Sequence, residues 1–103
     1  DEAWAREARD AILRASPLSA KLAFEQWRRG GKDMPIENAL ALEYRMTQHA
    51  MRGHDFFEGI RALLIDKDRK PRWQHRALHE VSATEVAAYF APIGDRELSF
   101  ERV

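Results

Sequence analysis

The sequence of 103 residues contains no cysteine, which excludes disulfide bonds, thiol catalysis and cysteine-bound metal. No apolar run approaches the roughly 20 residues that a membrane-spanning helix needs, so no membrane partner is expected. Net charge is absent as well, because 17 basic residues balance 17 acidic ones. Without an excess of positive charge, nucleic acid is not an expected partner either.

Strand-like alternation of polar and apolar residues is also missing, whereas apolar residues recur at helical spacing. We therefore predict an all-α protein of about five helices, with residues 1–103 forming a single helical domain or fragment. A charged connection, residues 66–80, separates the fourth predicted helix from the last. The predicted helices cover approximately residues 2–15, 17–30, 35–51, 55–65 and 82–90.

Three of these helices begin with a capping signal. Ser16 stands directly before Pro17, a combination favoured at a helix start. Asp55 and Ser82 each precede a glutamate by three residues, which is the spacing of a capping box. We expect each of these side chains to cap its own helix.

The second predicted helix is apolar on two sides. Phe24 and Trp27 lie on one side, and Leu18 and Leu22 lie nearly opposite. A small surface helix normally buries one face, so the second face needs a partner. Either the last helix or tail covers it, or a separate domain or subunit does. We favour the second explanation, because the sequence begins inside a predicted helix, as a piece cut from a longer polypeptide would.

The third predicted helix places Glu43 in the middle of an apolar arc. A buried carboxylate must be paired, because an unpaired one is costly. Arg52, His54 and Arg61 are the candidate partners on neighbouring elements. We interpret Glu43 as part of a structural ion pair rather than as a catalytic acid.

Most signatures of catalysis and metal binding are missing from the sequence. No glycine-rich phosphate loop, Gly-x-Ser-x-Gly motif or His-Glu-x-x-His motif occurs. His75 and His79 are four residues apart, but no third ligand follows, so we predict no zinc site. Asp66 and Asp68 are spaced like calcium ligands, but Lys70 occupies the next ligand position, which argues against calcium. No catalytic residue and no metal ligand is predicted.

Five basic residues gather around Trp73 in the charged connection. Such a cluster has three interpretations: a solvated loop, a contact to a phosphate-bearing cofactor, or nucleic-acid binding. The solvated loop ranks first because nearby aspartates dilute the charge, and nucleic acid ranks last because the rest of the chain is not basic. The five are Lys67, Arg69, Lys70, Arg72 and Arg76.

The run from Met51 to Asp68, MRGHDFFEGIRALLIDKD, closely resembles the 3-hydroxyisobutyryl-CoA hydrolase family of the enoyl-CoA hydratase/isomerase (crotonase) superfamily. Residues 16–19, 43–48, 71–73 and 97–100 resemble the same family, in order and at family-like spacing. The segment Ile-Asp-Lys-Asp that ends the run departs from the general superfamily pattern, which favours the hydrolase branch.

This resemblance implies an enzyme whose mixed α/β spiral core lies upstream of the present chain. That core would bind the CoA thioester and supply both the oxyanion hole and the acidic residues for water attack. The chain would then be a C-terminal lid and assembly region, inactive alone, of an enzyme of valine catabolism. Its implied partners are that core or a neighbouring subunit, and self-association is expected.

Lys67 is the candidate contact to coenzyme A, because the superfamily lysine at this position can touch the phosphate-bearing end of the cofactor. An exposed lysine favoured by the helix dipole is the competing explanation. No tightly bound cofactor is expected, since the CoA thioester is the substrate of the parent enzyme. Phe56 and Phe57 are predicted to be core, because they share a stripe with Ile60 and Leu63.

Two alternative functions remain open. The chain could be the C-terminal part of an enoyl-CoA hydratase or isomerase, or a stand-alone helical interaction module. The expected location is the cytoplasm for a bacterial protein and the mitochondrial matrix for a eukaryotic one.

Overall fold

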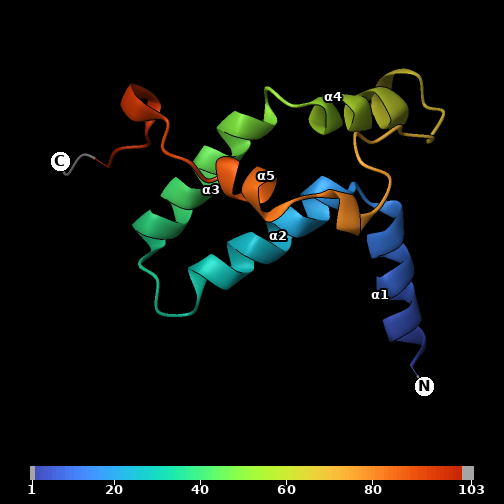
Figure 1. Ribbon diagram of the computed structural model, residues 1–103, viewed down its shortest axis with the longest axis horizontal. Coiled ribbons are helices and arrows are strands. Elements are labelled where there is room, and N and C mark those ends of the chain that lie inside the picture. Colours follow the sequence, from blue (N-terminus) through green and yellow to red (C-terminus); the bar gives the residue numbers. More distant parts are fainter. Residues whose placement is uncertain (1, 101–103) are drawn as a thin grey trace.

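A computed structural model describes residues 2–100, and these form helices without any strand, which confirms the all-α prediction (Figure 1). No helix in this range has the length and apolar character needed to cross a membrane. The elements are α1 (Ala3–Arg14), α2 (Pro17–Gly30), α3 (Ile36–Ala50), α4 (His54–Ile60), the π-helical η1 (Arg61–Ile65), the 3-10 turn η2 (Leu78–Glu80), α5 (Ala83–Ala88) and the 3-10 turn η3 (Gly94–Arg96).

Two of the three predicted caps are confirmed. The Ser16 hydroxyl accepts a hydrogen bond from the Ser19 N–H at 3.1 Å, and the Ser82 hydroxyl accepts one from the Glu85 N–H at 3.0 Å. These bonds satisfy N–H groups that a helix start leaves without partners, so they define where α2 and α5 begin.

The predicted cap at Asp55 is wrong. Gly53 is the N-cap of α4, and no side chain caps this helix. Asp55 is buried at 7% exposure, and its carboxylate accepts hydrogen bonds from the Ser16 hydroxyl and from the Gln74 N–H. A buried carboxylate needs partners for both oxygens, and these two donors lie on other segments of the chain.

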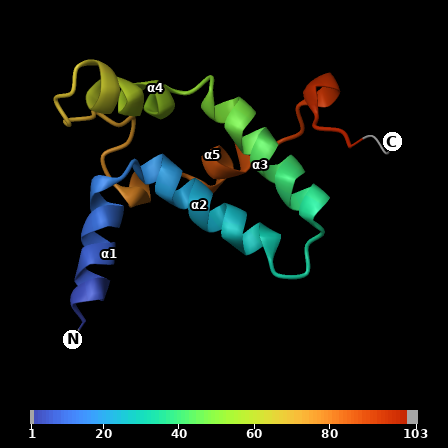
Figure 2. The same ribbon diagram turned by 180° about the vertical axis from the view of Figure 1, so that it is seen from behind.

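The hydrophobic core lies between α2, α3 and α5, which Figures 1 and 2 show side by side from opposite directions. Leu18 and Leu22 of α2 are buried there together with residues from the last third of the chain. The last helix and its neighbours therefore cover one of the two apolar faces of α2, and coverage of the other face by a separate domain or subunit stays a prediction. The remaining buried members are Val81, Val86 and Phe90, with Leu42, Met46 and Tyr89 packed against them.

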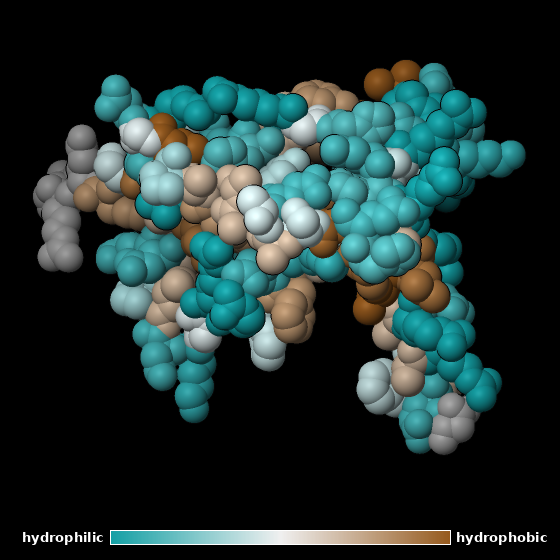
Figure 3. All heavy atoms as spheres, viewed as in Figure 1, coloured by the Kyte–Doolittle hydropathy of each residue, from teal (hydrophilic) through white to brown (hydrophobic). Residues whose placement is uncertain are grey.

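The opposite side of α2 is uncovered. Phe24 is 62% exposed and Trp27 is 74% exposed. Helix α1 projects away from the body of the molecule, and every residue of it is exposed (Figures 1 and 2). Hydrophobic side chains are visible where α1 meets α2 in the space-filling view (Figure 3). An apolar groove bordered by Ile12, Phe24 and Ala87 runs between α1, α2 and α5.

The predicted burial of Glu43 is wrong, because its side chain is exposed. Helix α3 packs on the core through Leu42 and Met46, which turns Glu43 toward solvent. Arg45 lies on the same helix and forms an ion pair with Glu97 at 2.9 Å. That pair joins α3 to the C-terminal segment. The ion pair of the third helix therefore involves Glu97 and not Glu43.

Phe56 and Phe57 were predicted to be core, and this prediction is wrong, because they are 45% and 52% exposed. The two rings contact each other edge to face at 5.3 Å. The inward face of α4 and η1 is formed by Asp55, Gly59 and Ala62 instead. These residues are small or hydrogen-bonded, so the charged connection can pack closely against this face.

Candidate ligand-contact site

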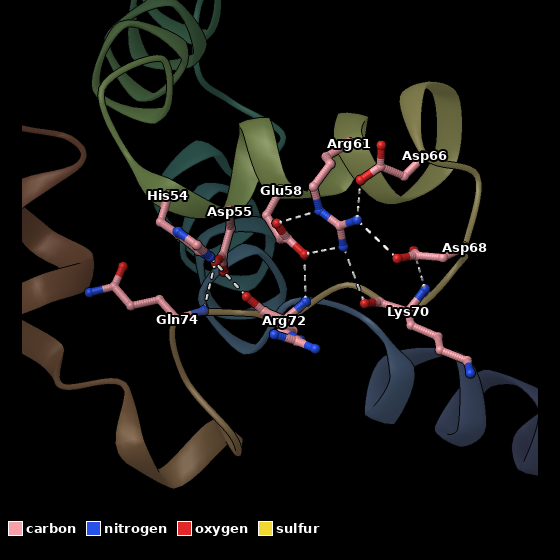
Figure 4. Close-up of polar contacts among 9 residues, drawn as sticks. All are labelled: His54, Asp55, Glu58, Arg61, Asp66, Asp68, Lys70, Arg72 and Gln74. Atoms are coloured by element: carbon pink, nitrogen blue, oxygen red, sulfur yellow. Dashed lines mark hydrogen bonds and ion pairs between the residues drawn. The ribbon is translucent and has the colours of Figure 1, made fainter.

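The charged connection folds back alongside α4 and η1, and directional polar contacts fix it there (Figure 4). The helix changes from α to π geometry at Arg61, where the Asp66 N–H donates to the Arg61 carbonyl at 2.8 Å. Such π turns are rare and occur often at functional sites. Here the turn sets the Arg61 side chain beside the start of the charged connection.

Arg61 contacts three carboxylates at once. Its Nε and Nη2 donate to Glu58 at 2.9 and 2.7 Å, in the two-pronged geometry that a guanidinium favours. Its Nη1 donates to Asp66 at 2.8 Å and to Asp68 at 2.9 Å. A further contact of Nη2 reaches the Lys70 carbonyl at 3.4 Å. Arg61 thereby joins η1 to both ends of residues 66–70.

The Glu58 carboxylate accepts hydrogen bonds from a side chain and from a backbone N–H, and both lower its pKa. Hydrogen bonds from Arg61 and from the Arg72 N–H at 2.8 Å lower the pKa of Glu58 to about 2. The Arg72 carbonyl is bonded to the ring of His54 at 2.8 Å. The backbone of Arg72 is thus held on both sides by residues of α4.

Asp55 links the charged connection to the start of α2. It accepts the Gln74 N–H at 2.8 Å and binds Ser16 at the start of α2. Trp73 lies between Arg72 and Gln74 in the sequence, and its ring packs on Gly59, where an added Cβ would lie 3.5 Å from the ring. The indole N–H of Trp73 donates to the Arg14 carbonyl at 3.3 Å. The charged connection is therefore attached to α1, α2 and α4 as well as to η1.

Lys67, the candidate CoA contact, is exposed at the turn that follows η1. Its backbone has φ 57°, and Arg69 has φ 56°. Non-glycine residues rarely adopt this left-handed region, which costs about 1–2 kcal/mol per residue. Within residues 2–100 the Lys67 ammonium has no hydrogen-bond or ion-pair partner, although Asp66 and Asp68 adjoin it in sequence.

The five basic residues of the charged connection are all exposed and are not equivalent. Lys70 and Arg72 line a small hollow beside Glu58 and Arg61, whereas Arg69 borders an apolar one next to Trp73. Glu58, Asp66 and Asp68 pair with Arg61, and although the two aspartates stay exposed, their charge is offset by this guanidinium. This surface has the chemistry of a phosphate contact.

Ser16 and His75 are buried outside this surface and make structural contacts, although Nδ1 of His75 has no hydrogen-bond partner within the described residues. The Ser16 hydroxyl is 5% exposed and is bonded on both sides, by Asp55 and by the Ser19 N–H. His75 is buried and its Nε2 lies 3.0 Å from Glu85. Among residues 2–100, no three side chains of the metal-ligating types gather closely enough to hold an ion, and His79 is exposed whereas His75 is buried.

The chain belongs to the enoyl-CoA hydratase/isomerase family, whose sequence profile matches residues 1–90. Among curated relatives, it is 48% identical to 3-hydroxyisobutyryl-CoA hydrolase of Gallus gallus over 86% of this chain and 23% of that protein. It is 39% identical to the enzyme of that name from Homo sapiens, over 94% of this chain and 25% of that protein. The resemblance to a C-terminal segment of such hydrolases is thereby confirmed.

Solved structures give the same fold. A chain titled enoyl-CoA hydratase from Rhodobacter sphaeroides 2.4.1 superimposes with a TM-score of 0.92 at 46% identity, covering 97% of this chain and 30% of that one. A carnitinyl-CoA dehydratase from Mycobacterium thermoresistibile superimposes with a TM-score of 0.87 at 40% identity, covering 98% and 28%. The present chain thus spans about a quarter of its curated relatives and under a third of these structures.

Arg61 is the residue of this site that the sequence pattern did not single out. It was considered as a partner for Glu43, yet it binds Glu58, three residues before it on the same helix. That spacing places two side chains on one helix face, so the Glu58 pair was visible in the sequence. The contacts to Asp66 and Asp68 depend on the π turn and on the fold of the charged connection, which no local pattern predicts.

Proposed function

We propose that this chain is the C-terminal helical part of a CoA-thioester enzyme, and that the parent enzyme hydrolyses 3-hydroxyisobutyryl-CoA or a close β-hydroxyacyl-CoA. The observation that carries this proposal is identity of 38–48% with hydrolases of that name across 86–94% of the chain. In such a reaction water attacks the thioester carbonyl, the carbon–sulfur bond breaks, and the free acid and the CoA thiol are released.

In this proposal the chain has an accessory role, as a lid and assembly surface. The family resemblance assigns the oxyanion hole and the catalytic acids to a part of the enzyme outside these residues. Exposed apolar side chains on α1, α2 and α4, among them Trp4, Trp27 and Phe57, support the presence of a covering partner. The partner would be the rest of the parent enzyme or a neighbouring subunit, so the isolated chain should self-associate and release no thiol.

Lys67 is assigned the contact to the phosphate-bearing end of CoA. Its ammonium is exposed, lies beside further basic residues, and is free of carboxylate partners within the described part of the chain. Lys67→Gln in the full-length polypeptide should raise KM for a CoA thioester, and Lys67→Arg should retain most of the affinity. An unchanged KM for Lys67→Gln would remove this assignment without affecting the hydrolase assignment.

The reaction is tested by measuring thiol release from 3-hydroxyisobutyryl-CoA by the full-length polypeptide, beside hydration of crotonyl-CoA. Thiol release without hydration is expected. Hydration without thiol release would favour the alternative, an enoyl-CoA hydratase, which the likeness to the Rhodobacter sphaeroides structure supports. Activity on neither substrate would favour a helical interaction module.

The location follows the same proposal. The curated relatives carry mitochondrial in their names. We therefore place the parent enzyme in the mitochondrial matrix if it is eukaryotic, and in the cytoplasm if it is bacterial. Fractionation of the source cells with a thiol-release assay would test this.

A further inference from the structure

The two carboxylates that adjoin Lys67 bind the same guanidinium. Asp66 and Asp68 each accept a hydrogen bond from Nη1 of Arg61, at 2.8 and 2.9 Å. Asp68 uses its other oxygen for the Lys70 N–H at 2.9 Å. These contacts lower the pKa of Asp68, with the Lys70 N–H as the larger cause and Arg61 as the next. Two negative groups that would compete for the Lys67 ammonium are therefore already engaged.

Arg61 has no donor left for a ligand. A guanidinium carries five N–H groups. Nε donates to Glu58, Nη1 to Asp66 and Asp68, and Nη2 to Glu58 and the Lys70 carbonyl, so each N–H has a protein acceptor (Figure 4). Arg61 is therefore unsuited to bind a phosphate directly, although it lies beside the basic surface.

The backbone around Lys67 also needs support from outside the turn. Lys67 and Arg69 both have positive φ, a conformation that side chains with a Cβ disfavour. Arg61 contacts residues on each side of Lys67, and the Arg69 N–H donates to the Ala62 carbonyl at 2.9 Å. Glu58, whose side chain is 10% exposed, holds the guanidinium itself in place.

We propose that Arg61 is a positioning residue for Lys67: by holding Asp66, Asp68 and the backbone between them, it keeps the Lys67 ammonium available to a nucleotide phosphate. This inference rests on the proposed contact between Lys67 and CoA. Without Arg61, Asp66 is released and Asp68 keeps only the Lys70 N–H, so both carboxylates can compete with the phosphate for Lys67 and repel the phosphate themselves. Loss of Arg61 thus weakens phosphate binding through Lys67, not through a contact of its own.

The test compares Arg61→Gln, Arg61→Lys, Lys67→Gln and the double variant R61Q/K67Q in the full-length polypeptide. Each is assayed with a CoA thioester and with the matching pantetheine thioester, which lacks the nucleotide phosphates. The readout is the ratio of the two KM values, because a general structural defect changes both. Arg28→Gln is the matched control, since Arg28 binds Glu25 three residues away in the same two-pronged manner on a distant surface.

Lys67→Gln should raise the KM ratio on the order of tenfold, the loss of one charge-assisted contact. Arg61→Gln should raise it at least as much, and the double variant no further than Arg61→Gln alone, because the two residues act on one contact. Arg61→Lys keeps the charge but lacks the planar fork, so it should raise the ratio by a smaller factor. Arg28→Gln should leave the ratio unchanged.

Three results would overturn the inference. Additive effects of the two single variants would show that Arg61 acts independently of Lys67. A wild-type ratio for either Arg61→Gln or Arg61→Lys would show that this guanidinium is not needed. Equal rises in both KM values would indicate a structural role only. If Lys67→Gln itself leaves the ratio unchanged, the proposed CoA contact fails, and that outcome is distinct from a failure of Arg61 alone.

Discussion

Two regions of this molecule are stabilised by different forces. The helices α2, α3 and α5 meet through a small apolar core, in which Leu18 and Phe90 are 3% and 2% exposed. The charged connection is instead held against α4 and η1 by directional hydrogen bonds, which Arg61 donates to it and which Glu58 and Asp55 accept from its backbone. The hydrophobic effect is non-directional, whereas these hydrogen bonds fix single backbone groups. Lys67 and Arg69, which have positive φ, both lie in the region that these directional hydrogen bonds hold.

The largest effect is expected in the apolar region. Phe90→Ala should lower the free energy of unfolding by about 3–5 kcal/mol, because it removes a buried ring and leaves a cavity. Urea unfolding followed by circular dichroism measures this. Phe100→Ala is the control, since Phe100 is 47% exposed and should change stability little. Equal losses in both variants would contradict the position of the core.

Sequence alone predicted much of the apolar region. Helical spacing, Ser16 before Pro17, and the glutamate after Ser82 located α2 and α5, since these signals depend on a few neighbouring residues. The face of α3 was misassigned, because Glu43 and Leu42 differ by one position and only tertiary packing decides which of them turns inward.

The polar region was less predictable. The family resemblance pointed to Lys67, but Asp55 was taken for a local cap. Its real partners, Ser16 and Gln74, lie 39 and 19 residues away in the sequence. Long-range hydrogen bonds of this kind leave no periodic signal, so residues such as Asp55 and Arg61 can be assigned only once the fold is known.

The second largest loss of stability is expected where the two regions meet, at Asp55. Asp55→Ala should destabilise the protein by about 2 kcal/mol, because the Ser16 hydroxyl and the Gln74 N–H lose a charged acceptor. Thermal unfolding measures the loss. Asp55→Asn retains one acceptor oxygen and should recover part of it. An Asp55→Ala variant as stable as the wild type would show that this contact contributes nothing.

The polar region should also respond to acid before the core does, but only at low pH. Hydrogen bonds from Arg61 and from the Arg72 N–H lower the pKa of Glu58 from 4.5 to about 2. A depressed carboxylate pKa stabilises the folded state above the unfolded pKa, and this contribution is lost as the pH falls from about 4.5 toward about 2. The Arg72 amide resonance should shift in the acid range with a midpoint near pH 2, the pKa of Glu58. A titration midpoint near pH 4.5 would contradict the hydrogen bonds that Glu58 accepts from Arg61 and from the Arg72 N–H.

The smallest effect is expected at the exposed pair of Glu25 and Arg28. Its geometry matches that of Glu58 and Arg61, with contacts of 2.9 and 2.6 Å, but within residues 2–100 Arg28 is bonded to no other segment of the chain. Exposed pairs within one helix contribute little to stability. Arg28→Gln should therefore leave thermal unfolding unchanged. A clear loss would show that pairing along the helix matters more than attachment of a distant segment.

Peptide-resolved amide hydrogen exchange of Arg61→Gln beside the wild type tests the central claim most directly, because it separates the two regions in one measurement. The amides of Arg69, Lys70 and Arg72 should exchange faster in the variant, since their backbone is no longer fixed, while those of α2 and α5 keep their protection. Unchanged exchange in residues 66–74, or an equal increase in α2 and α5, would contradict the account in which one guanidinium holds the ligand-contact segment apart from the apolar core.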